Sequence, residues 1–310
     1  MSCGSHDSKQ SSHSSKVTVH ATQRGKTRDI AASLEYDEIT DPIVVLDGNG
    51  NIKLWYLPGA IDHIHQKCVW DSLNVLRAPL EESLKKSHNH GWRNDHLLFR
   101  ETADLTGSID LSPGWYQQGH GPPNFHPEVS RLLKSGQERN GTRQWVNEMS
   151  EFHALLSGTL AIIHPQMYAA GREALIRLDM EAKRREDTDM SSILPSWNSI
   201  YNSVSIMVNR ATPYHTDVNG REPWLDMLVT VGDYPPLDFV IPTLNLRFRY
   251  NPGTIIAMSG SALEHGVGYT EGNHTCLAYY MRHNVHQSVG VQLCQPPNVT
   301  DLEPLIIVNS

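Results

Sequence analysis

The stretch NSVSIMVNRATPYHTDVNG, residues 202–220, decides the fold. Its first half alternates apolar side chains at Val204, Ile206 and Val208, which is typical of a strand with one buried face. Its second half places His215 and Asp217 two positions apart. Side chains two apart on a strand, or at its end, project to the same side. The stretch therefore predicts a strand that delivers an imidazole and a carboxylate together, as a hydrogen-bonded pair or as two ligands of one metal.

Further strand-like segments follow, separated by Gly, Pro and Asn turns and with no helical pattern between them. They are WLDMLVTVG (224–232), LNLRFRYNPG (244–253), TIIAMSG (254–260) and HTCLAYYMRHNVH (274–286). Such a series favours an antiparallel barrel or jelly roll. Helix-like spacing occurs only before it, over about 142–186, where His164-Pro165 separates two predicted helices. The fold class predicted is therefore α+β, with a jelly-roll core and supporting helices.

The part before residue 141 is less regular. Two β-rich runs, Ile43–Leu46 and Ile52–Leu57, flank a Gly/Asn turn and predict a hairpin. A Pro- and Gly-rich loop over 111–127 fits no regular element. The predicted organisation is a disordered tail and linker (1–40), an N-terminal extension packed on the core (41–140), the helices with the jelly-roll core (141–300) and a C-terminal tail (301–310).

Composition excludes several classes of protein. The 310 residues are 39% hydrophobic, and no apolar run approaches the roughly 20 residues that cross a bilayer. The start of the chain lacks the apolar region of a secretion signal, so secretion is not expected. Four separated cysteines form no CxxC pair, which argues against a zinc ribbon. The net charge of -8 argues against a surface that coats nucleic acid, although a local basic groove stays compatible with it.

A third ligand and an arginine turn the His-x-Asp pair into a candidate iron site. His265 follows a buried-looking strand and a turn, and it completes a set of two histidines and one carboxylate. That set leaves three metal positions open, as in non-haem iron(II) oxygenases. Arg282 follows within an apolar strand, on the same parity as Tyr280, so its guanidinium is expected to face inward and to need an anion. Arg210, on the face of Val204, Ile206 and Val208, is expected to be a second cation at the same cavity.

This order of residues resembles that of 2-oxoglutarate-dependent iron(II) oxygenases. The resemblance implies Fe(II), 2-oxoglutarate and O2 as cofactor and co-substrates. It assigns His215, Asp217 and His265 as metal ligands and catalytic residues. It assigns Arg282 as the anchor of the far carboxylate of 2-oxoglutarate, with Arg210 as a second contact.

Longer segments are similar to the TET/JBP-like oxygenases, in particular those expanded in mushroom-forming (basidiomycete) fungi. They are LWYLPGAI, SPGWYQQGHG, AIIHPQMYAAGREAL, NRATPYHTDVNG, LRFRYNPGTIIAMSGSALEHG and CLAYYMRHNVH. The resemblance covers about 40–290 and implies a double-stranded β-helix core. By analogy with that family, it also implies oxidation of a methylated base in DNA, 5-methylcytosine or N6-methyladenine, and therefore a nuclear location.

Base recognition has no equally clear signal in the sequence. The polar candidates near the motifs are Asn209, Asn219, Asn284 and His286. A DNA backbone would need a basic groove, since phosphates are bound by Lys and Arg. Two candidate patches are the alternating Arg247 and Arg249, and a group made of Lys85, Lys86, Arg93 and Arg100.

Two other functions stay open from the sequence. The same chemistry could act on a small molecule or a protein side chain, which the acidic net charge favours and which would suit a cytoplasmic location. The chain could also be a non-catalytic jelly-roll binding module, against which the complete set of metal-ligating residues argues.

Overall fold

Two β-sheets form the centre of the protein in the computed structural model, which describes residues 18–23, 26–31, 36–85 and 92–301. The larger described sheet has seven strands, and all neighbours in it are antiparallel. In spatial order they are β4 (Ile43–Leu46), β5 (Ile52–Leu57), β12 (Ile255–Met258), β9 (Asp226–Asp233), β14 (Asn273–Tyr280), β7 (Ser203–Val208) and β6 (Gly107–Leu111).

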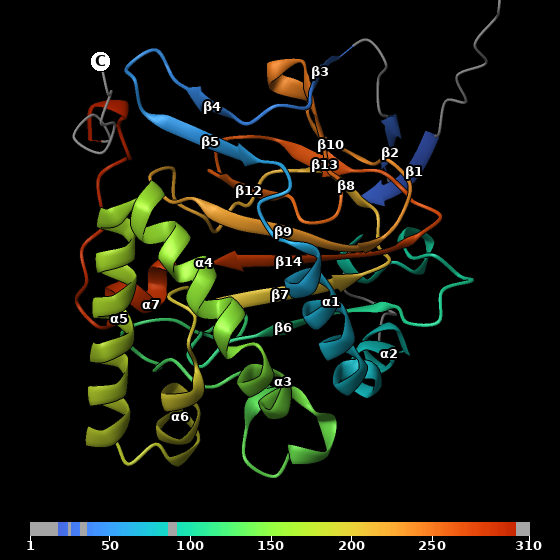
Figure 1. Cartoon of the computed structure of the whole chain (residues 1–310). Helices are drawn as coiled ribbons and strands as arrows, with labels where there is room; N and C mark the ends of the chain where they lie inside the picture. The colour runs from blue at the N-terminus through green and yellow to red at the C-terminus, as the bar shows by residue number, and fades with distance from the viewer. Residues whose placement is uncertain (1–17, 24–25, 32–35, 86–91, 302–310) are drawn as a thin grey trace, which may run out of the picture.

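The smaller sheet faces the larger one (Figure 1) and contains the strands that end or begin at the two predicted histidine ligands. Its order is β3 (Asp37–Ile39), β11 (Leu246–Arg249), β10 (Asp238–Ile241), β13 (His265–Val267) and β8 (Thr212–His215). The β3–β11 pair is parallel and the other described pairs are antiparallel. A separate antiparallel hairpin joins β1 (Thr18–Gln23) to β2 (Lys26–Ala31).

Helices cover the outer face of the larger sheet (Figure 1). They are α1 (His63–Ser72), α2 (Arg77–Lys85), α3 (Thr142–Glu148), α4 (Ser150–Ile163), α5 (Pro165–Arg184) and α6 (Thr188–Ile193); α7 (His283–Ser288) follows β14 and packs near α5. None of these helices has both the length and the apolar character needed to span a membrane.

The strand pleat divides the core into two parts. Along β9, Met227 and Val229 pack against the helices, whereas Leu228 packs between the two sheets with Phe239 of β10. The inter-sheet space is apolar at the β5 and β11 end and opens into a cavity at the other end. The fold thus holds a cavity between two sheets that the helix layer supports from outside.

The predicted α+β class is confirmed by these antiparallel sheets, and the observed bounds of β4 and β5 are those predicted for the hairpin. Pro165 begins α5 as predicted, where its missing N–H leaves no hydrogen bond unmade. The single helix expected before it is instead two, because Met149 departs from helical geometry between α3 and α4.

Three described strands lie within residues 1–40, where the sequence predicts a tail and linker. They are β1, β2 and β3, and β3 pairs with β11, about 200 residues away in sequence. Residues 1–17 and 302–310 of the two predicted tails lie outside the described residues. The domain boundaries at residues 40, 140 and 300 stay predictions.

A buried histidine in the helix layer makes the fold sensitive to acid. His153 of α4 is 0% exposed and packs against the rings of Trp145, Trp197 and Tyr279. Neither ring nitrogen has a hydrogen-bond partner among the described residues. Burial lowers the pKa of His153 to about 3, from an ordinary value of 6.5. The folded state therefore holds this imidazole neutral.

Replacing His153 by Phe should reduce the loss of stability in acid. Between pH 6.5 and about 3 the unfolded chain binds a proton at His153 that the folded chain does not. This difference in proton binding does not affect the free energy of unfolding above pH 6.5. As the pH falls below 6.5, it lowers the free energy of unfolding by about 1.4 kcal/mol per pH unit. In urea unfolding, the free energy of unfolding of H153F relative to that of the wild type should be higher at pH 5.5 than at pH 7.5. Equal pH slopes for the two proteins would contradict the assignment.

Candidate metal and co-substrate site

The two predicted histidine ligands lie opposite each other across one pair of strands. His215 ends β8 and His265 begins β13, and the antiparallel register pairs these two residues directly. Their ring centroids are 4.3 Å apart. The ring of His265 also stacks on Phe239 at 5.5 Å, which fixes its plane. Strand pairing therefore brings together two histidines that are 50 positions apart in the sequence.

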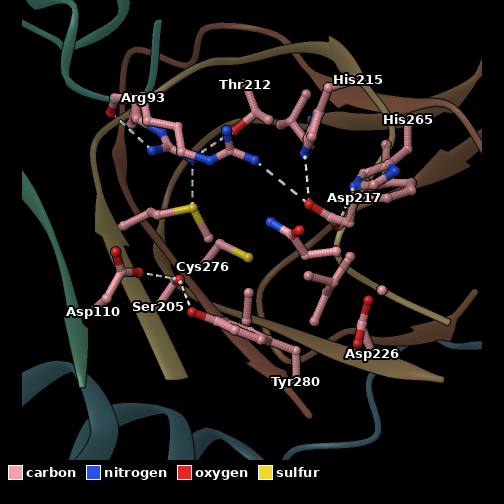
Figure 2. Close-up of a pocket in the computed structure, with 18 of the residues that line it drawn as sticks. Arg93, Asp110, Ser205, Thr212, His215, Asp217, Asp226, His265, Cys276 and Tyr280 are labelled. Atoms are coloured by element: carbon pink, nitrogen blue, oxygen red, sulfur yellow. Dashed lines mark hydrogen bonds and ion pairs between the residues drawn. The ribbon is translucent and has the colours of Figure 1, made fainter. Parts of the chain in front are cut away.

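Asp217 completes the group. Its backbone N–H donates to the carbonyl of Gly260 at 2.8 Å, which ties the turn after β8 to the turn after β12. Its carboxylate oxygens lie 3.7 Å from His215 Nε2 and 3.9 Å from His265 Nε2. Figure 2 shows the three side chains pointing toward one another. One ligand atom from each of the three residues lies within 4.8 Å of the others. The structure thus brings the predicted triad to a common centre.

The hydrogen bonds of the two histidines suit a metal. Nδ1 of His215 lies 2.9 Å from the Pro213 carbonyl, and Nδ1 of His265 lies 2.9 Å from the Leu263 carbonyl. A carbonyl accepts only, so each Nδ1 carries the proton and each Nε2 presents a free lone pair toward Asp217. Burial, and next the neighbouring His265, hold the pKa of His215 well below its usual range, which keeps it neutral. The donor set therefore fits a divalent iron with open positions.

Arg210 reaches the same cavity, but not by the face that the sequence predicts. Val204, Ile206 and Val208 pack against the helices, whereas Ser205 and Met207 line the cavity. Asn209 has a left-handed backbone with φ of 54°, which asparagine tolerates better than most residues. This residue breaks the alternation after β7. Arg210 consequently lies on the cavity side, together with Met207 and not with Val208.

The Arg210 side chain is a buried cation. It is 6% exposed, and burial lowers its pKa to about 10. Its Nη1 donates to the Arg93 carbonyl at 3.0 Å, and its Nη2 donates to Met207 Sδ at 2.6 Å. Within the described part of the chain it forms no ion pair with a carboxylate. A buried guanidinium without a counter-charge is a site for an anion.

Arg282 lies at another part of the cavity. It does not sit within a strand as predicted: β14 ends at Tyr280, and Arg282 precedes α7. Its Nε donates to Ser203 Oγ at 3.3 Å and its Nη2 to the Tyr280 hydroxyl at 3.1 Å. Its guanidinium also lies over the rings of Trp115 and Tyr280. Arg282 contacts Ser203, and Arg210 contacts Met207. These two positions are four residues, or about 13 Å, apart along β7, so the two arginines line different regions of the cavity.

Asp226 is a functional candidate that sequence reasoning missed. It begins β9, is 8% exposed and lines the cavity, and its carboxylate has no hydrogen bond or ion pair to another described residue. Burial, and next the nearby Asp217, raise its pKa well above the ordinary value. A side chain at Gly260 would come within 2.8 Å of both carboxylates, so this glycine permits them to share the space. The signal was present in the sequence, as an acid within the apolar run WLDMLVTVG.

Trp92 and Arg93 also line the cavity; no sequence signal points to Trp92, and the sequence suggests Arg93 only as part of a candidate basic patch. The Trp92 ring lies 4.8 Å from that of His215. Arg93 Nη2 lies 3.6 Å from Asp217 Oδ1, and the Arg93 side chain is 56% exposed. These residues are more than 100 positions before the His-x-Asp motif, in a segment without periodicity. Only the folded chain places them beside it.

The predicted base-recognition candidates are mostly elsewhere. Asn219 lines the cavity. Asn209 is buried as a backbone bridge, because its side chain bonds the Leu105 carbonyl and the His274 N–H at 2.8 Å each. Asn284 and His286 lie in α7 outside the cavity lining, and His286 packs against Trp224.

The predicted basic patches are largely neutralised. Arg247 and Arg249 form ion pairs with Glu38 of β3 and with Asp238 of β10. Arg100 donates to the Glu271 carbonyl and to Asn273. Lys86 lies outside the described residues, and Lys85 is exposed at the end of α2. Of these cations, Arg93 is the one that the cavity lining includes within the described part of the chain.

Comparison with known proteins agrees with this geometry. The Tet_JBP family model, described as the oxygenase domain of the 2OGFeDO superfamily, matches residues 112–283, more than half of the chain. Among solved structures, NgTET1 in complex with 5mC DNA is similar in fold, with a TM-score of 0.53, 14% identity and coverage of 82% of this chain and 84% of that one. A 2OG-Fe(II) oxygenase family oxidoreductase from Burkholderia pseudomallei aligns over 75% of this chain and 85% of its own, with 12% identity and a TM-score of only 0.35. No curated protein matches the sequence.

The match includes all three residues of the triad and both cavity arginines, Arg210 and Arg282. The chain therefore belongs to the Tet_JBP family of 2-oxoglutarate- and Fe(II)-dependent dioxygenases, oxygenases that use Fe(II), 2-oxoglutarate and O2.

Proposed function

We propose that this protein oxidises the methyl group of a modified nucleobase in DNA, 5-methylcytosine or N6-methyladenine, and releases succinate and CO2. The observation that carries the proposal is the cavity of about 350 Å³ beside the triad, which has separate polar groups for a co-substrate and a substrate. Its size lies in the range of small-molecule sites, about 300–1,000 Å³. The similarity of fold to NgTET1, whose structure contains 5mC DNA, supports the choice of substrate.

In this proposal His215, Asp217 and His265 hold the metal, and Arg210 binds the far carboxylate of 2-oxoglutarate. Bound Fe(II) would supply the activation of O2, coupled to decarboxylation of 2-oxoglutarate. The charge of Arg210 acts on the pKa of His215, after burial and the effects of His265 and Arg93, so this guanidinium lies within electrostatic reach of the triad. Arg282, hydrogen-bonded to hydroxyls and stacked on aromatic rings, would face the substrate instead.

A base in duplex DNA would have to leave the helix to reach this cavity. Asp226 would then be the polar group opposite its hydrogen-bonding edge, and the walls of Leu228 and Phe239 would exclude water. Arg93, half-exposed and lining the cavity, would lie near the backbone phosphates. A nuclear location and the closer kinship with fungal members of the family are part of this proposal.

The test is succinate formation by the full chain with methylated and unmethylated oligonucleotides, single-stranded and duplex. The proposal expects turnover above the basal rate only with a methylated base, and expects the oxidised base in the product. Basal succinate with every methylated oligonucleotide would overturn the substrate assignment and leave the cofactors untouched.

A second candidate is the same chemistry on a small molecule or a protein side chain. It is favoured by the net charge of -8 and by the ion pairs that neutralise Arg247 and Arg249. It predicts that oligonucleotides fail in the succinate assay while a metabolite or peptide extract stimulates turnover.

Asp226 gives this proposal a sharper test. Asp226→Ala should lower kcat/KM for the methylated oligonucleotide about tenfold or more, because a buried hydrogen-bond partner is lost. Asp226→Asn should retain most of the activity, since a neutral carboxyl and an amide both offer a donor and an acceptor. Basal 2-oxoglutarate turnover should change little in either variant. An equal fall in basal turnover would instead assign Asp226 to the metal site.

A further inference from the structure

The residues between Trp92 and Arg100 run beside the approach to the His-x-Asp motif. The Ala211 N–H donates to the Leu98 carbonyl at 2.8 Å, and the Arg100 N–H donates to the Asn209 carbonyl at 2.9 Å. Trp92, Leu98, Phe99 and Ala211 form their own buried cluster, with Tyr214 packed against it. This segment, 92–100, lies outside the residues that the family model matches. It is a part of the site that belongs to this chain's N-terminal extension.

Trp92 is the point where this segment meets the chemistry. It is 6% exposed, and its ring lies 4.8 Å from the His215 ring, tilted by 58°. The guanidinium carbon of Arg210 lies over the same indole at 5.4 Å, and that of Arg93 at 4.6 Å. One side chain thus contacts a metal ligand and the cation that we assign to the co-substrate.

Each of these two contacts of the Trp92 ring has a physical effect on its partner. The negative face of an indole attracts a guanidinium, and the attraction grows when the pair is shielded from water, as Arg210 is. The same ring limits rotation of the His215 imidazole, whose other constraint is the hydrogen bond from Nδ1 to the Pro213 carbonyl. Groups that orient a metal ligand commonly change metal affinity by about 10- to 100-fold. Trp92 is therefore placed to affect the binding of both the metal and 2-oxoglutarate without contacting either of them.

The neighbouring residue strengthens the arrangement. The Arg93 carbonyl accepts the hydrogen bond from Arg210 Nη1 at 3.0 Å, so the backbone of this turn fixes the guanidinium from a second direction. Arg93 and Arg210 are like charges, and the charge of Arg93 contributes to lowering the pKa of Arg210, after burial. The indole ring and the carbonyl offset that repulsion.

We propose that Trp92 is a positioning residue that holds His215 and Arg210 in one arrangement, so that metal binding and 2-oxoglutarate binding depend on the same indole. The proposal rests on the role of Arg210 proposed above and is independent of the identity of the oxidised substrate.

The test compares Trp92→Leu, which removes the ring, with Trp92→Phe, which keeps an aromatic face. Trp70→Leu is the control, because Trp70 packs half-buried against the helix-side core, away from the cavity. The affinities of the full chain for Mn(II), and for 2-oxoglutarate in the Mn(II)-loaded protein, are measured by calorimetry without O2. Melting temperatures are recorded in parallel.

W92L should weaken both 2-oxoglutarate binding and metal binding about tenfold. W92F should stay within about threefold of the wild type, and W70L should lower only the melting temperature. In the double variant W92L/R210Q, 2-oxoglutarate binding should be no weaker than in R210Q, since the two residues act as one unit.

Unchanged affinities in W92L, with a lowered melting temperature, would reduce Trp92 to a packing residue and overturn the proposal. Equal losses in W92L and W92F would also overturn the role given to the aromatic face. Failure of the DNA substrate is a separate result, because it shows in the succinate assay with wild-type protein and leaves these affinities unaffected.

Discussion

Replacing His215 by Ala should abolish 2-oxoglutarate turnover, with a fall of about 10³-fold or more, because residues that act as a unit lose nearly the whole activity together. Asp217→Ala and His265→Ala should fall to the same level. The three side chains meet within 4.8 Å, and each imidazole has its Nδ1 hydrogen-bonded to a carbonyl, so the remaining donors cannot reproduce the set. Turnover of the wild type should return when Fe(II) is added back after chelation, and that of H215A should not.

A second measurement separates loss of metal from loss of fold. A metal that binds only the folded chain raises its stability, by about 2.7 kcal/mol at 100 times the dissociation constant. The melting temperature of the wild type should therefore rise with Mn(II), and that of H215A should stay constant. The matched control is His126→Ala, an exposed histidine in the segment between β6 and α3, which should behave as the wild type. A metal-dependent shift that survives in H215A would contradict the assignment of this ligand.

Arg210→Gln should raise the KM for 2-oxoglutarate about 100-fold, since loss of a buried partner of an anion costs roughly 2–5 kcal/mol. Arg210 is almost fully buried and has no carboxylate partner among the described residues. Removing it from the protein without ligand should cost no stability, because an unpaired buried cation is unfavourable. The melting temperature of R210Q without 2-oxoglutarate should therefore equal or exceed that of the wild type.

Arg282→Gln is the matched comparison, and it decides between two assignments. The resemblance to 2-oxoglutarate-dependent oxygenases implies Arg282 as the anchor, whereas burial and proximity to the triad favour Arg210. We expect R282Q to change the KM for 2-oxoglutarate by less than about threefold and to act mainly on substrate turnover. The opposite pattern, with R282Q impaired and R210Q normal for 2-oxoglutarate, would restore the assignment that follows from the sequence.

The parts of the fold that the sequence predicts are those with a local cause. The hairpin of β4 and β5 follows from two β-rich runs and a Gly/Asn turn, and the start of α5 follows from Pro165. The residues of the triad could also be predicted from the sequence, because the His-x-Asp spacing is local and His265 follows a recognisable turn. Its geometry, however, depends on the pairing of β8 with β13, which only the fold provides.

The parts that could not be predicted depend on distant partners. The sequence predicts a basic strand face at Arg247 and Arg249, yet Glu38, some 210 residues earlier, forms an ion pair with each of them. Trp92 reaches His215 from a segment without periodicity. Arg210 was expected on the wrong face because alternation along a strand assumes a constant backbone, and Asn209 departs from it. In each case the missing information is a contact or a torsion, which composition and spacing do not contain.

The left-handed residue at 209 also sets a condition for transplanting this strand into another scaffold. Upstream of it, even-numbered side chains belong to the helix layer; downstream, Arg210 and Thr212 belong to the cavity. Asparagine serves because its side chain bridges Leu105 and His274 while its backbone turns. A graft that kept Arg210 but placed valine at 209 would favour ordinary strand torsions and aim the guanidinium at the wrong layer. A graft should therefore include Asn209 and Arg210 together, along with the backbone segments at Leu105 and His274 that the asparagine side chain bridges.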